Sequence, residues 1–306
     1  MLLSIIIPCY NSARFISKTL DMLIAQGLDD CEIIVVNDGS TDATYEIVYS
    51  YSKKNERIKI IDKINEGVSV ARNTGMEHST GKYIIFLDSD DIFELGTLDF
   101  YRKVLGVYPN KDFFAFGYYT KYKNKIKKDY AVKQYDEKIL DSNLLKQSFF
   151  LKKICFNICS CIYLSSFLIK HSIQFTPGVR IGEDVEFLLK VLAVADSCVY
   201  HARHCFVYQI RDDSVMQGYK KYSLDYFNSF IKIYNSTQLI DCDELKKNYF
   251  IVFNYMSNLY HYLKSGIRSD EIDRLFTSYK YVLSFSIPFS ILKFLKMILK
   301  IFLFRI

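Results

Sequence analysis

The sequence lacks the cysteine patterns of a zinc site or a disulfide-bonded scaffold. None of its eight cysteines belongs to a Cys-x-x-Cys pair, and Cys155, Cys159 and Cys161 do not have the spacing of zinc ligands. The amino terminus also lacks the basic segment of a signal peptide, and Pro8 interrupts its apolar run. We therefore expect buried, reduced thiols in a cytosolic protein whose chain begins with a β-strand.

The basic residues are concentrated at one end of the chain. The formal net charge is +6, yet residues 280–306 contain five basic residues and no acidic residue. These are Lys280, Lys293, Lys296, Lys300 and Arg305. The rest of the chain is close to neutral, which argues against a nucleic-acid-binding body, because such a body needs a basic stripe on its folded surface. Half of the 306 residues are hydrophobic, enough for a sizeable core.

The first ninety residues alternate between short apolar runs and segments with helical spacing. The apolar runs, which we expect to be strands, are residues 2–8, 32–37, 58–61 and 83–87. A strand and a helix that repeat in this way predict parallel βαβ units with right-handed crossovers. Because the runs are apolar throughout, we expect helices on both faces of the sheet.

The pattern loosens beyond about residue 110. Residues 121–138 are rich in lysine and tyrosine, and we expect a solvated hairpin or loop there rather than a binding site. Residues 183–195 have helical spacing, residues 199–210 are typical of strands, and residues 220–262 are typical of helices rich in tyrosine and phenylalanine.

Each of the four expected strands ends in polar or turn-forming residues. These segments are residues 8–11, 38–42, 65–67 and 88–91. Parallel sheets bind ligands outside the carboxyl ends of their strands. We therefore expect the four segments to meet at one edge of the sheet and to form a binding site there.

Three carboxylates occur within four residues after the last of these strands. Asp88, Asp90 and Asp91 would repel one another if all were ionised with no positive charge among them. A hard divalent cation such as Mg²⁺ or Mn²⁺ prefers oxygen ligands and also binds substrate phosphates. The segment is a candidate metal site. The alternative is an acidic loop without a metal, since short Asp-x-Asp matches are common.

The segment VVNDGSTD, residues 35–42, is the second candidate. Gly39 accommodates a positive φ, so the chain can turn sharply after the strand and leave Asp38 pointing outward as an acceptor for a ligand. Ser40, Thr41 and Asp42 can cap the helix that follows. The alternative is an ordinary capped loop between a strand and a helix.

Together with IIIPCYN at the amino terminus, GVSVARN at 67–73 and GED at 182–184, these motifs resemble the family 2 glycosyltransferases. Those are inverting nucleotide-sugar enzymes with a GT-A fold, and the resemblance covers residues 2–215 in motif order and spacing. It implies an α/β fold with a Rossmann-like, mostly parallel central sheet flanked by helices, and a helical C-terminal extension.

The resemblance also implies a division of the chain. A GT-A catalytic domain would occupy residues 1–215, with a nucleotide-binding half at 1–110 and an acceptor half at 111–215. A helical extension at 216–280 and an amphipathic basic tail at 281–306 would follow.

The resemblance implies which residues bind the donor. Pro8, Tyr10 and Asn11 would line the base and ribose, and Asp38 would accept a hydrogen bond from the base, usually uracil. The other donor-binding positions, which would contact the nucleotide, the diphosphate or the sugar, are Gly67, Arg72, Asn73, Asp88, Ser89 and Asp91.

Sugar transfer needs a cation to stabilise the departing diphosphate and a separate base to take the acceptor proton. The resemblance makes Asp90 the direct ligand of Mn²⁺ or Mg²⁺, and Asp88 a ligand of the ribose or of the metal through water. It makes Asp184 the general base and Glu183 a positioning group. Aligned N–H groups at a helix start favour such carboxylates. The alternative is that both acidic residues only complement the helix dipole.

The segment YQIRDDSVM, residues 208–216, corresponds in the family to a loop that closes over the donor diphosphate. Arg211 is the expected phosphate contact, with Ser214 beside it. Many relatives have a histidine here as a metal ligand. None of the five histidines of this chain falls in the segment, so the sequence does not support metal coordination by this loop.

The last residues, 283–306, are strongly apolar. Lys293, Lys296 and Lys300 share one helical face, and three lysines in mid-segment argue against a bilayer-spanning helix. We expect a helix that lies on an anionic membrane surface. The alternative is a helix that packs on the protein's own core or on a partner.

The resemblance implies the function of a metal-dependent inverting glycosyltransferase, a hexosyl- or N-acetylhexosaminyltransferase of bacterial surface-polysaccharide assembly (O-antigen, capsule or exopolysaccharide). Its donor would be a nucleotide sugar, expected to be UDP-linked, and its acceptor a glycan or an undecaprenyl-diphosphate-linked glycan. It would be cytoplasmic and peripheral on the inner face of the plasma membrane. No nucleic-acid partner is expected, and the sequence specifies neither the sugar nor the oligomeric state.

Two other functions remain open from the sequence. A sugar-nucleotide nucleotidyltransferase shares a similar fold, but it normally has a glycine-rich basic loop after the first strand, which PCYNSARF lacks. A non-catalytic, membrane-associated scaffold would retain the fold without the activity. The presence of Asp88, Asp90 and Asp184 argues against the scaffold.

Overall fold

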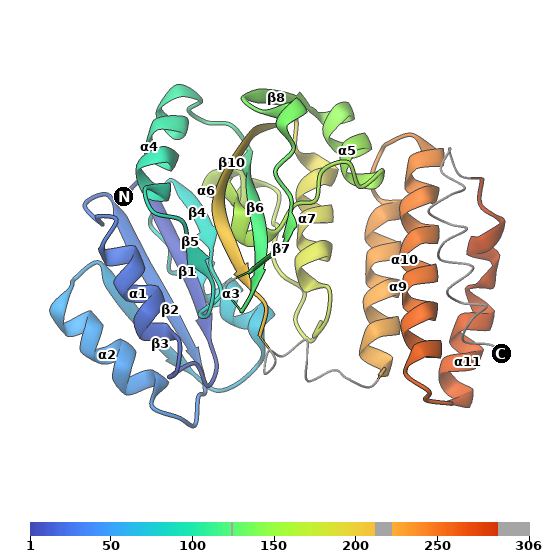
Figure 1. The fold of residues 1–306 in the computed structure, drawn as a ribbon, viewed down its shortest axis with the longest axis horizontal. Coiled ribbons are helices and arrows are strands. Elements are labelled where there is room, and N and C mark those ends of the chain that lie inside the picture. Colours follow the sequence, from blue (N-terminus) through green and yellow to red (C-terminus); the bar gives the residue numbers. More distant parts are fainter. Residues whose placement is uncertain (124, 212–221, 287–306) are drawn as a thin grey trace. The chain divides into compact units, whose positions relative to one another are not determined.

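The computed structural model of the chain describes residues 1–123, 125–211 and 222–286. Its elements, shown in Figure 1, form two compact units, which we call the sheet unit and the helical unit. The sheet unit comprises Met1–Ser142, Cys155–Gly178 and Val194–Ile210, and the helical unit comprises Asn143–Ile154, Val179–Ala193 and the described part of Arg211–Ile306. The division differs from the expected boundary after residue 215, because two internal segments belong to the helical unit.

The sheet unit is built on one mixed sheet of ten described strands. Along the main path the order is β3-β2-β1-β4-β9-β6-β10-β5, while β7 pairs with β6 and β8 pairs with β10. The strands are β1 Leu3–Cys9, β2 Cys31–Asp38, β3 Ile58–Lys63, β4 Tyr83–Phe86, β5 Ile92–Phe93, β6 Phe113–Tyr122, β7 Lys125–Asp129, β8 Lys138–Asp141, β9 Cys161–Leu164 and β10 Ser197–Gln209.

The first four strands of the chain are mutually parallel, as expected. Ile5 of β1 lies between Ile33 of β2 and Ile85 of β4, and β2 pairs in parallel with β3. All residues of β1, β2 and β4 are buried, as the apolar runs predicted. The remaining strands of the path include antiparallel pairs, with β9 antiparallel to both β4 and β6.

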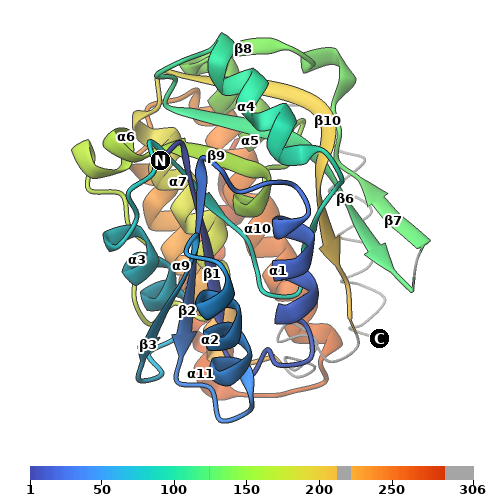
Figure 2. The ribbon, with the colours of Figure 1, turned by 90° about the vertical axis from the view of Figure 1, so that its left-hand side faces the viewer.

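Helices cover both faces of the parallel strands. The helices of the sheet unit are α1 Ile16–Ile24, α2 Thr44–Lys54, α3 Val68–Glu77, α4 Thr97–Val107 and α6 Ser165–Lys170. Figure 2 shows α1 and α3 on opposite sides of β1 and β2. Right-handed crossovers require this, because β1, β2 and β3 advance in one direction along the sheet and β4 returns in the other.

One glycine shows how closely α3 packs on the sheet. A Cβ at Gly75 would lie 2.3 Å from Cγ2 of Ile6 in β1, so only glycine permits this approach. The residue lies in the middle of α3, where it costs some helix propensity. The contact fixes α3 directly beneath β1, and α3 carries Arg72 and Asn73.

The helical unit has its own aromatic core. Its helices are α5 Ser142–Phe150, α7 Glu183–Val194, α9 Leu224–Gln238, α10 Glu244–Lys264 and α11 Asp270–Ser278, followed by the short 3₁₀ helix Lys280–Ser284. Phe276 of α11 packs edge-on against Phe227 at 4.8 Å and against Tyr255 at 5.6 Å between ring centroids. Phe250 of α10 contacts Phe149 and Phe150 of α5 at 5.4 Å each, which explains why α5 belongs to this unit.

Across residues 1–123, 125–211 and 222–286, no helix is both long enough and apolar enough to cross a membrane. The expected membrane-surface helix belongs to the tail at residues 281–306, and residues 287–306 of that tail lie outside the described residues.

Gly39 provides a test of the turn after β2. Its φ is +68°, and a Cβ there would lie 2.7 Å from the backbone nitrogen of Asn65. We expect Gly39→Ala to lower the free energy of unfolding by about 2–3 kcal/mol, from the left-handed backbone and the clash together. Gly106→Ala is the matched control, because its Cβ meets no atom within 4 Å and α4 should gain up to about 1 kcal/mol. Urea denaturation of both variants decides: equal stability of the two would refute this account of the turn.

Candidate active site

The carboxyl ends of β1, β2, β3 and β4 lie at one edge of the sheet, because these strands are parallel. The order of the strands reverses beside β1, with β2 and β3 on one side and β4 on the other. Open α/β sheets bind ligands outside their carboxyl ends at such a switch point. The predicted meeting of the four strand-end segments at one edge is therefore confirmed.

The loop after β1 is fastened to the loop after β2. The backbone N–H of Asn11 donates to Oγ of Ser40 at 2.9 Å, and Oδ1 of Asn11 accepts from the N–H of Thr41 at 2.8 Å. The φ of Asn11 is +50°, which asparagine tolerates better than most residues. Tyr10, between the strand and this anchor, is 53% exposed. A tyrosine ring held out from a fixed loop offers a stacking surface to a planar group.

Pro8 and Gly67 shape the backbone at this edge. The backbone carbonyl of Ile6 faces β4 and accepts a hydrogen bond from the N–H of Leu87. The backbone nitrogen of Pro8, two residues later in β1, faces the same side, but the pairing of β1 with β4 ends at Ile6. The missing N–H of Pro8 therefore breaks no ladder hydrogen bond. Gly67 precedes α3 with a φ of +92°. Pro8 is buried within β1, so only its backbone surroundings, and not an exposed ring, are available to a ligand.

Asp38 does not point outward, so that expectation was wrong. It is 3% exposed, and its carboxylate accepts hydrogen bonds from the backbone N–H groups of Glu66 at 3.0 Å and Gly67 at 2.8 Å. Lys63 donates from Nζ at 2.8 Å. Although burial of the ammonium acts against it, hydrogen bonds to Asp38 and Glu66 raise the pKa of Lys63. Asp38 therefore holds the loop after β3 in place at the sheet edge.

The acidic segment after β4 is a β-turn fastened to α1. The N–H of Asp91 donates to the carbonyl of Asp88 at 3.1 Å, closing the turn. The hydroxyl of Ser89 is 2.7 Å from the hydroxyl of Ser12. The backbone carbonyl of Ser89 accepts a hydrogen bond from the hydroxyl of Thr19 at 2.8 Å. Ser89, expected at the donor, is thus engaged with the protein, and it orients the carboxylates on either side.

The positive charge beside the aspartates comes from α3. Nη2 of Arg72 lies 2.8 Å from Oδ1 of Asp88, and the guanidinium stacks over the ring of Phe175 at 5.1 Å from its centroid. The Arg72 side chain is only 4% exposed. Its position is fixed by the neighbouring Asn73, whose amide donates to the carbonyl of Phe175 and accepts from the N–H of Phe175.

These contacts change two expected roles. The Asn73 amide makes one donor and one acceptor bond to the backbone of Phe175, so it holds that segment in place, and its nucleotide contact stays a prediction. Arg72 is the counter-ion of Asp88 rather than an exposed group. Asp91, expected to face the donor sugar, is 1% exposed and accepts from the N–H of Gln209 at 2.8 Å, which binds the turn to the end of β10.

The turn offers oxygen donors that suit a hard divalent cation. Carboxylate oxygens of Asp88 and Asp91 and Sγ of Cys159 lie within 4.8 Å of one another. Among the described residues, these three form the cluster of side chains that could hold a metal ion. The turn brings its first and fourth residues together, with Asp90 half-buried between them, and the expected pair of ligands, Asp88 and Asp90, stays a prediction. Burial and the charges of Asp88 and Asp91 raise the pKa of the Cys159 thiol, which keeps it protonated and unsuitable for a hard cation.

Asp90 lies near β1. Burial raises the pKa of the Cys9 thiol, and the charges of Asp88 and Asp90 raise it further. The carboxylates of the turn thus add a negative charge to the switch point between β1 and β4. Oxygen donors of this charge match Mg²⁺ or Mn²⁺.

The expected base belongs to the helical unit. Glu183 and Asp184 open α7, directly after Gly182, and Oδ1 of Asp184 accepts from the N–H of Val185 at 2.7 Å. Gly182 has a φ of +75°, and a Cβ there would lie 2.4 Å from Oγ of Ser229 in α9. The close contact fixes the start of α7. Glu183 and Asp184 are half-buried in its first turn, at the positive end of the helix dipole.

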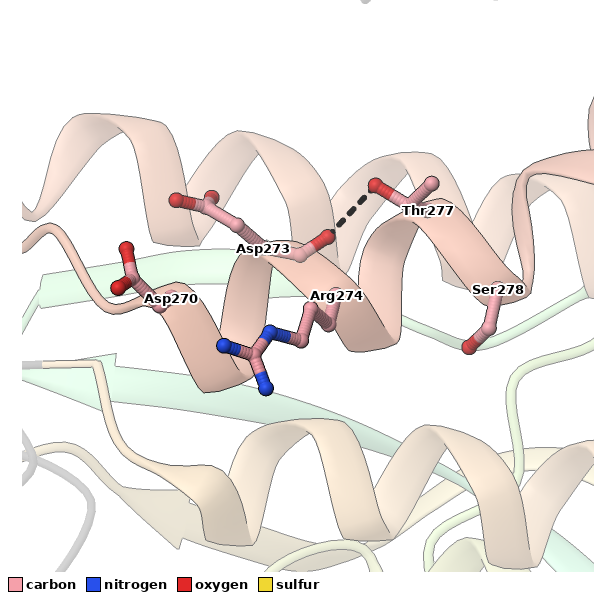
Figure 3. Close-up of a pocket in the computed structure, with 5 residues that line it drawn as sticks. All are labelled: Asp270, Asp273, Arg274, Thr277 and Ser278. Carbon is pink, nitrogen blue, oxygen red and sulfur yellow. Dashed lines mark hydrogen bonds between the residues drawn. The ribbon is translucent and has the colours of Figure 1, made fainter.

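Two further expected residues follow β10. Arg211 comes two residues after Gln209 and is half-buried, and Ser214 lies outside the described residues. A hollow of about 440 Å³ on α11, drawn in Figure 3, is lined by Asp270, Asp273, Arg274, Thr277 and Ser278. It contains none of the expected site residues, and its one drawn hydrogen bond, Thr277 to the carbonyl of Asp273, is internal to the helix.

Several residues of the site edge were not expected from the sequence. They are Ser12, Thr19, Lys63, Cys159, Phe175 and Gln209. Lys63 is the last residue of β3, just before the loop that Asp38 holds. A lysine at that strand end could have been recognised in the sequence as a partner for Asp38. Phe175 lies 102 residues from Asn73, and no local pattern marks such a contact.

Comparison with known sequences gives one family. The family model described as "Glycosyl transferase family 2" matches residues 4–171. The Glycosyltransferase GlyA of Streptococcus pneumoniae serotype 4 is 31% identical over 221 residues, which are 70% of this chain and 31% of GlyA. The Uncharacterized glycosyltransferase EpsJ of Bacillus subtilis is 49% identical over 90 residues, 29% of this chain and 26% of EpsJ. The chain thus spans less than a third of the length of these two relatives.

Comparison with solved structures gives the same fold. Residues 1–349 of S. aureus TarS in complex with UDP-GlcNAc superpose with a TM-score of 0.70 at 20% identity, over 93% of this chain and 88% of that one. The mannosyltransferase PcManGT of Pyrobaculum calidifontis, in complex with GDP-Man and Mn²⁺, gives a TM-score of 0.60 at 13% identity, over 99% of this chain and 85% of that one. At these identities the likeness shows the fold alone.

Proposed function

Because the chain belongs to the family 2 glycosyltransferases and has their GT-A fold, we propose that it transfers a sugar from a nucleotide-sugar donor, UDP-linked, to a glycan acceptor. The observation that carries the proposal is the meeting of three fastened loops at the switch point of the sheet. They are the Tyr10 loop, the loop held by Asp38 and the Asp88–Asp91 turn. Nucleotide complexes of TarS and PcManGT support the donor class.

The nucleotide would bind along the loops after β1, β2 and β3. Tyr10 is the exposed ring that can stack on the base, and Asn11 holds it in place through the Ser40–Thr41 loop. The buried carboxylate of Asp38 would act on the base through the loop that it fastens, or directly where a lone pair remains. These groups are set before the ligand arrives, which lowers the entropy lost on binding.

A divalent cation, Mn²⁺ or Mg²⁺, would be held by Asp90 together with Asp88 and Asp91. When bound, it would neutralise charge on the leaving diphosphate. The carboxylates cluster on a turn whose geometry is fixed by Ser89 and Thr19, so the oxygen donors need no assembly. Arg72 would hold the Asp88 carboxylate in place, since the two form an ion pair at 2.8 Å.

Asp184 would act as the general base, positioned by Glu183. The acceptor hydroxyl would lose its proton to the Asp184 carboxylate while its oxygen forms a bond to the anomeric carbon. The bond from that carbon to the diphosphate oxygen would break at the same time, and the nucleoside diphosphate would leave with both bonding electrons. Attack opposite the leaving group inverts the anomeric configuration. Arg211 would contact the diphosphate, with Ser214 beside it.

The acceptor would be a glycan, free or linked to undecaprenyl diphosphate, in bacterial surface-polysaccharide assembly. The enzyme would then work at the inner face of the plasma membrane, as a hexosyl- or N-acetylhexosaminyltransferase. The basic tail at residues 281–306, expected from its sequence to bind a membrane surface, would support this location.

A panel of nucleotide sugars tests the proposed function. The purified chain is incubated with each UDP-, GDP- and dTDP-sugar in the presence of Mn²⁺, and the released nucleoside diphosphate is measured. We expect one UDP-sugar to be hydrolysed slowly without acceptor and faster with acceptor lipid extract. Failure to release any nucleotide would instead favour the non-catalytic scaffold. In a separate incubation with a nucleoside triphosphate and a sugar phosphate, consumption of both would favour a nucleotidyltransferase.

A further inference from the structure

The β6–β7 hairpin carries the highest density of positive charge in the described sheet unit. Residues 121–128 contain five lysines and no acidic residue. All five residues of β7 are exposed, including Ile126 at 62%. We call this segment, without residue 124, the lysine hairpin. Its sequence predicted only a solvated hairpin.

The hairpin is rigid at its base. Tyr118 and Tyr130 stack at 4.5 Å between ring centroids, and the N–H of Tyr130 donates to the carbonyl of Tyr118. Asp129, the acidic residue next to the lysines, is 2.8 Å from Nε2 of His204 in β10 and also accepts from the N–H of Ala131. Asp129 is therefore already engaged by His204 and Ala131 at the base of the hairpin, and the lysines extend from that ordered base.

The hairpin extends past the edge that carries the candidate site. Strand β9 is antiparallel to both β4 and β6, so β6 runs in the same direction as β4. Ile162 pairs with Ile85 on one side and with Phe114 on the other, which puts these two residues at the same level. Tyr122 is eight residues beyond that level and Asp88 three, a difference of about 16 Å along the strand direction. Figure 2 shows β7 at the periphery, far from β3.

Four of the five lysines in the hairpin have no carboxylate partner among the described residues. They are Lys121, Lys125, Lys127 and Lys128. Lys127 lies over the ring of Tyr122 at 5.3 Å, so its charge stays at the surface. Exposed lysines with an aromatic and an isoleucine among them match the interfacial region of an anionic bilayer, which takes apolar side chains as well as charge.

We propose that the lysine hairpin docks on an anionic lipid bilayer. The docking would bring the carboxyl edge of the sheet, with the Asp88–Asp91 turn, close to the membrane surface. A lipid-linked acceptor could then reach the site without leaving the bilayer. The proposal does not depend on the proposed activity, because bilayer binding is measured without a donor or an acceptor.

Vesicle binding of the full-length chain tests the docking. The vesicles contain 30% phosphatidylglycerol in phosphatidylcholine, and the variant carries Lys125→Gln, Lys127→Gln and Lys128→Gln. Each lysine near an anionic surface contributes roughly a fivefold factor, so we expect the variant to bind on the order of 100-fold more weakly. The matched control, Lys54→Gln with Lys103→Gln and Lys170→Gln, removes the same charge from exposed helical positions and should bind like the wild type. Residues 287–306 are present in every protein compared.

Two further comparisons test whether the hairpin binds a bilayer, binds a soluble polyanion, or carries lysines only to protect an edge strand. Ile126→Ser should weaken binding severalfold at constant charge, because an apolar side chain enters the interface. If the lysine variant binds vesicles as tightly as the wild type, the lysines only protect an exposed edge strand from pairing, and the proposal is overturned. Equal loss in both lysine variants would also overturn the proposal, because net charge rather than the hairpin would then drive binding. An Ile126→Ser variant that binds vesicles normally, while polyphosphate binding depends on the hairpin, would overturn it and point to a soluble polyanion.

Discussion

Replacement of Asp184 by asparagine is expected to abolish sugar transfer while leaving nucleotide binding intact. The amide has the shape of the carboxylate but cannot take the acceptor proton. Loss of a general base typically costs 10²–10⁴-fold in turnover, so we expect kcat to fall by about this factor. The measurement is steady-state transfer with the donor identified by the nucleotide-sugar panel, together with calorimetric titration of UDP. The effect should be far larger in kcat than in the Kd for UDP.

The control for this variant is Asp225→Asn. Asp225 also lies in the first turn of a helix of the same unit. Its replacement by asparagine therefore removes the same kind of helix-dipole interaction, worth about 0.3–1 kcal/mol of stability. It should retain wild-type kcat. If Asp184→Asn keeps wild-type turnover, Asp184 is only a dipole partner and the base lies elsewhere.

Replacement of Asp90 by alanine is expected to remove most of the Mn²⁺-supported turnover. Charge stabilisation by a metal at a leaving diphosphate contributes several kcal/mol, which corresponds to about 10³-fold in rate. Asp90 is half-buried on the turn, and the Asp88–Asp91 hydrogen bond that closes the turn does not involve it. The fold of the variant should therefore be intact. Electron paramagnetic resonance of Mn²⁺ with UDP, which reads metal binding without turnover, should show weaker binding.

Two companion variants sharpen this prediction. Asp91→Ala should lower stability as well as metal binding, because the buried carboxylate accepts from Gln209 and holds β10 to the turn. Asp29→Ala removes an exposed carboxylate that precedes β2, at the opposite edge of the sheet, and should change neither quantity. Normal Mn²⁺–UDP binding by Asp90→Ala would mean that Asp88 and Asp91, which lie close together, hold the metal without it.

The sheet and the position of the site could be predicted from the sequence because both follow from local patterns. Apolar runs of strand length, separated by helices, dictate parallel strands, and the carboxyl ends of parallel strands share an edge. The polar residues at those ends, such as Tyr10 and Asp88, therefore had to lie at the same edge. The sharp turn at Gly39 also followed from residue type, and its φ of +68° confirms it.

What each side chain does at that edge depended on partners far away in the chain. Asp38 is buried because Lys63 and the N–H groups of the loop after β3 surround its carboxylate, 25 to 29 residues later. Asn73 is occupied by Phe175, which is 102 residues away. Contacts of this range follow from the packing of α3 and its neighbours, which no single segment specifies.

The division into units was also set by packing rather than by chain order. Segments 143–154 and 179–193 lie inside the expected catalytic domain, yet Phe149 and Phe150 pack on Phe250, and Gly182 packs on Ser229. The sequence placed α7 correctly as a helix, with Glu183 and Asp184 in its first turn. It did not predict that these residues belong to the helical unit. Their place in that unit depends on the packing of aromatic side chains that are distant in the chain, and such packing produces no periodic pattern in the sequence.

The central claim is that the nucleotide of a sugar donor binds at the carboxyl edge of the sheet. Hydrogen–deuterium exchange of the full-length chain, with and without UDP and Mn²⁺, tests it most directly. We predict slower exchange at residues 9–13, 38–42, 64–68 and 87–92, and unchanged exchange at the opposite edge around residues 29–32 and 80–83. Protection confined to α11, or no protection at the four loops under saturating UDP and Mn²⁺, would contradict the account.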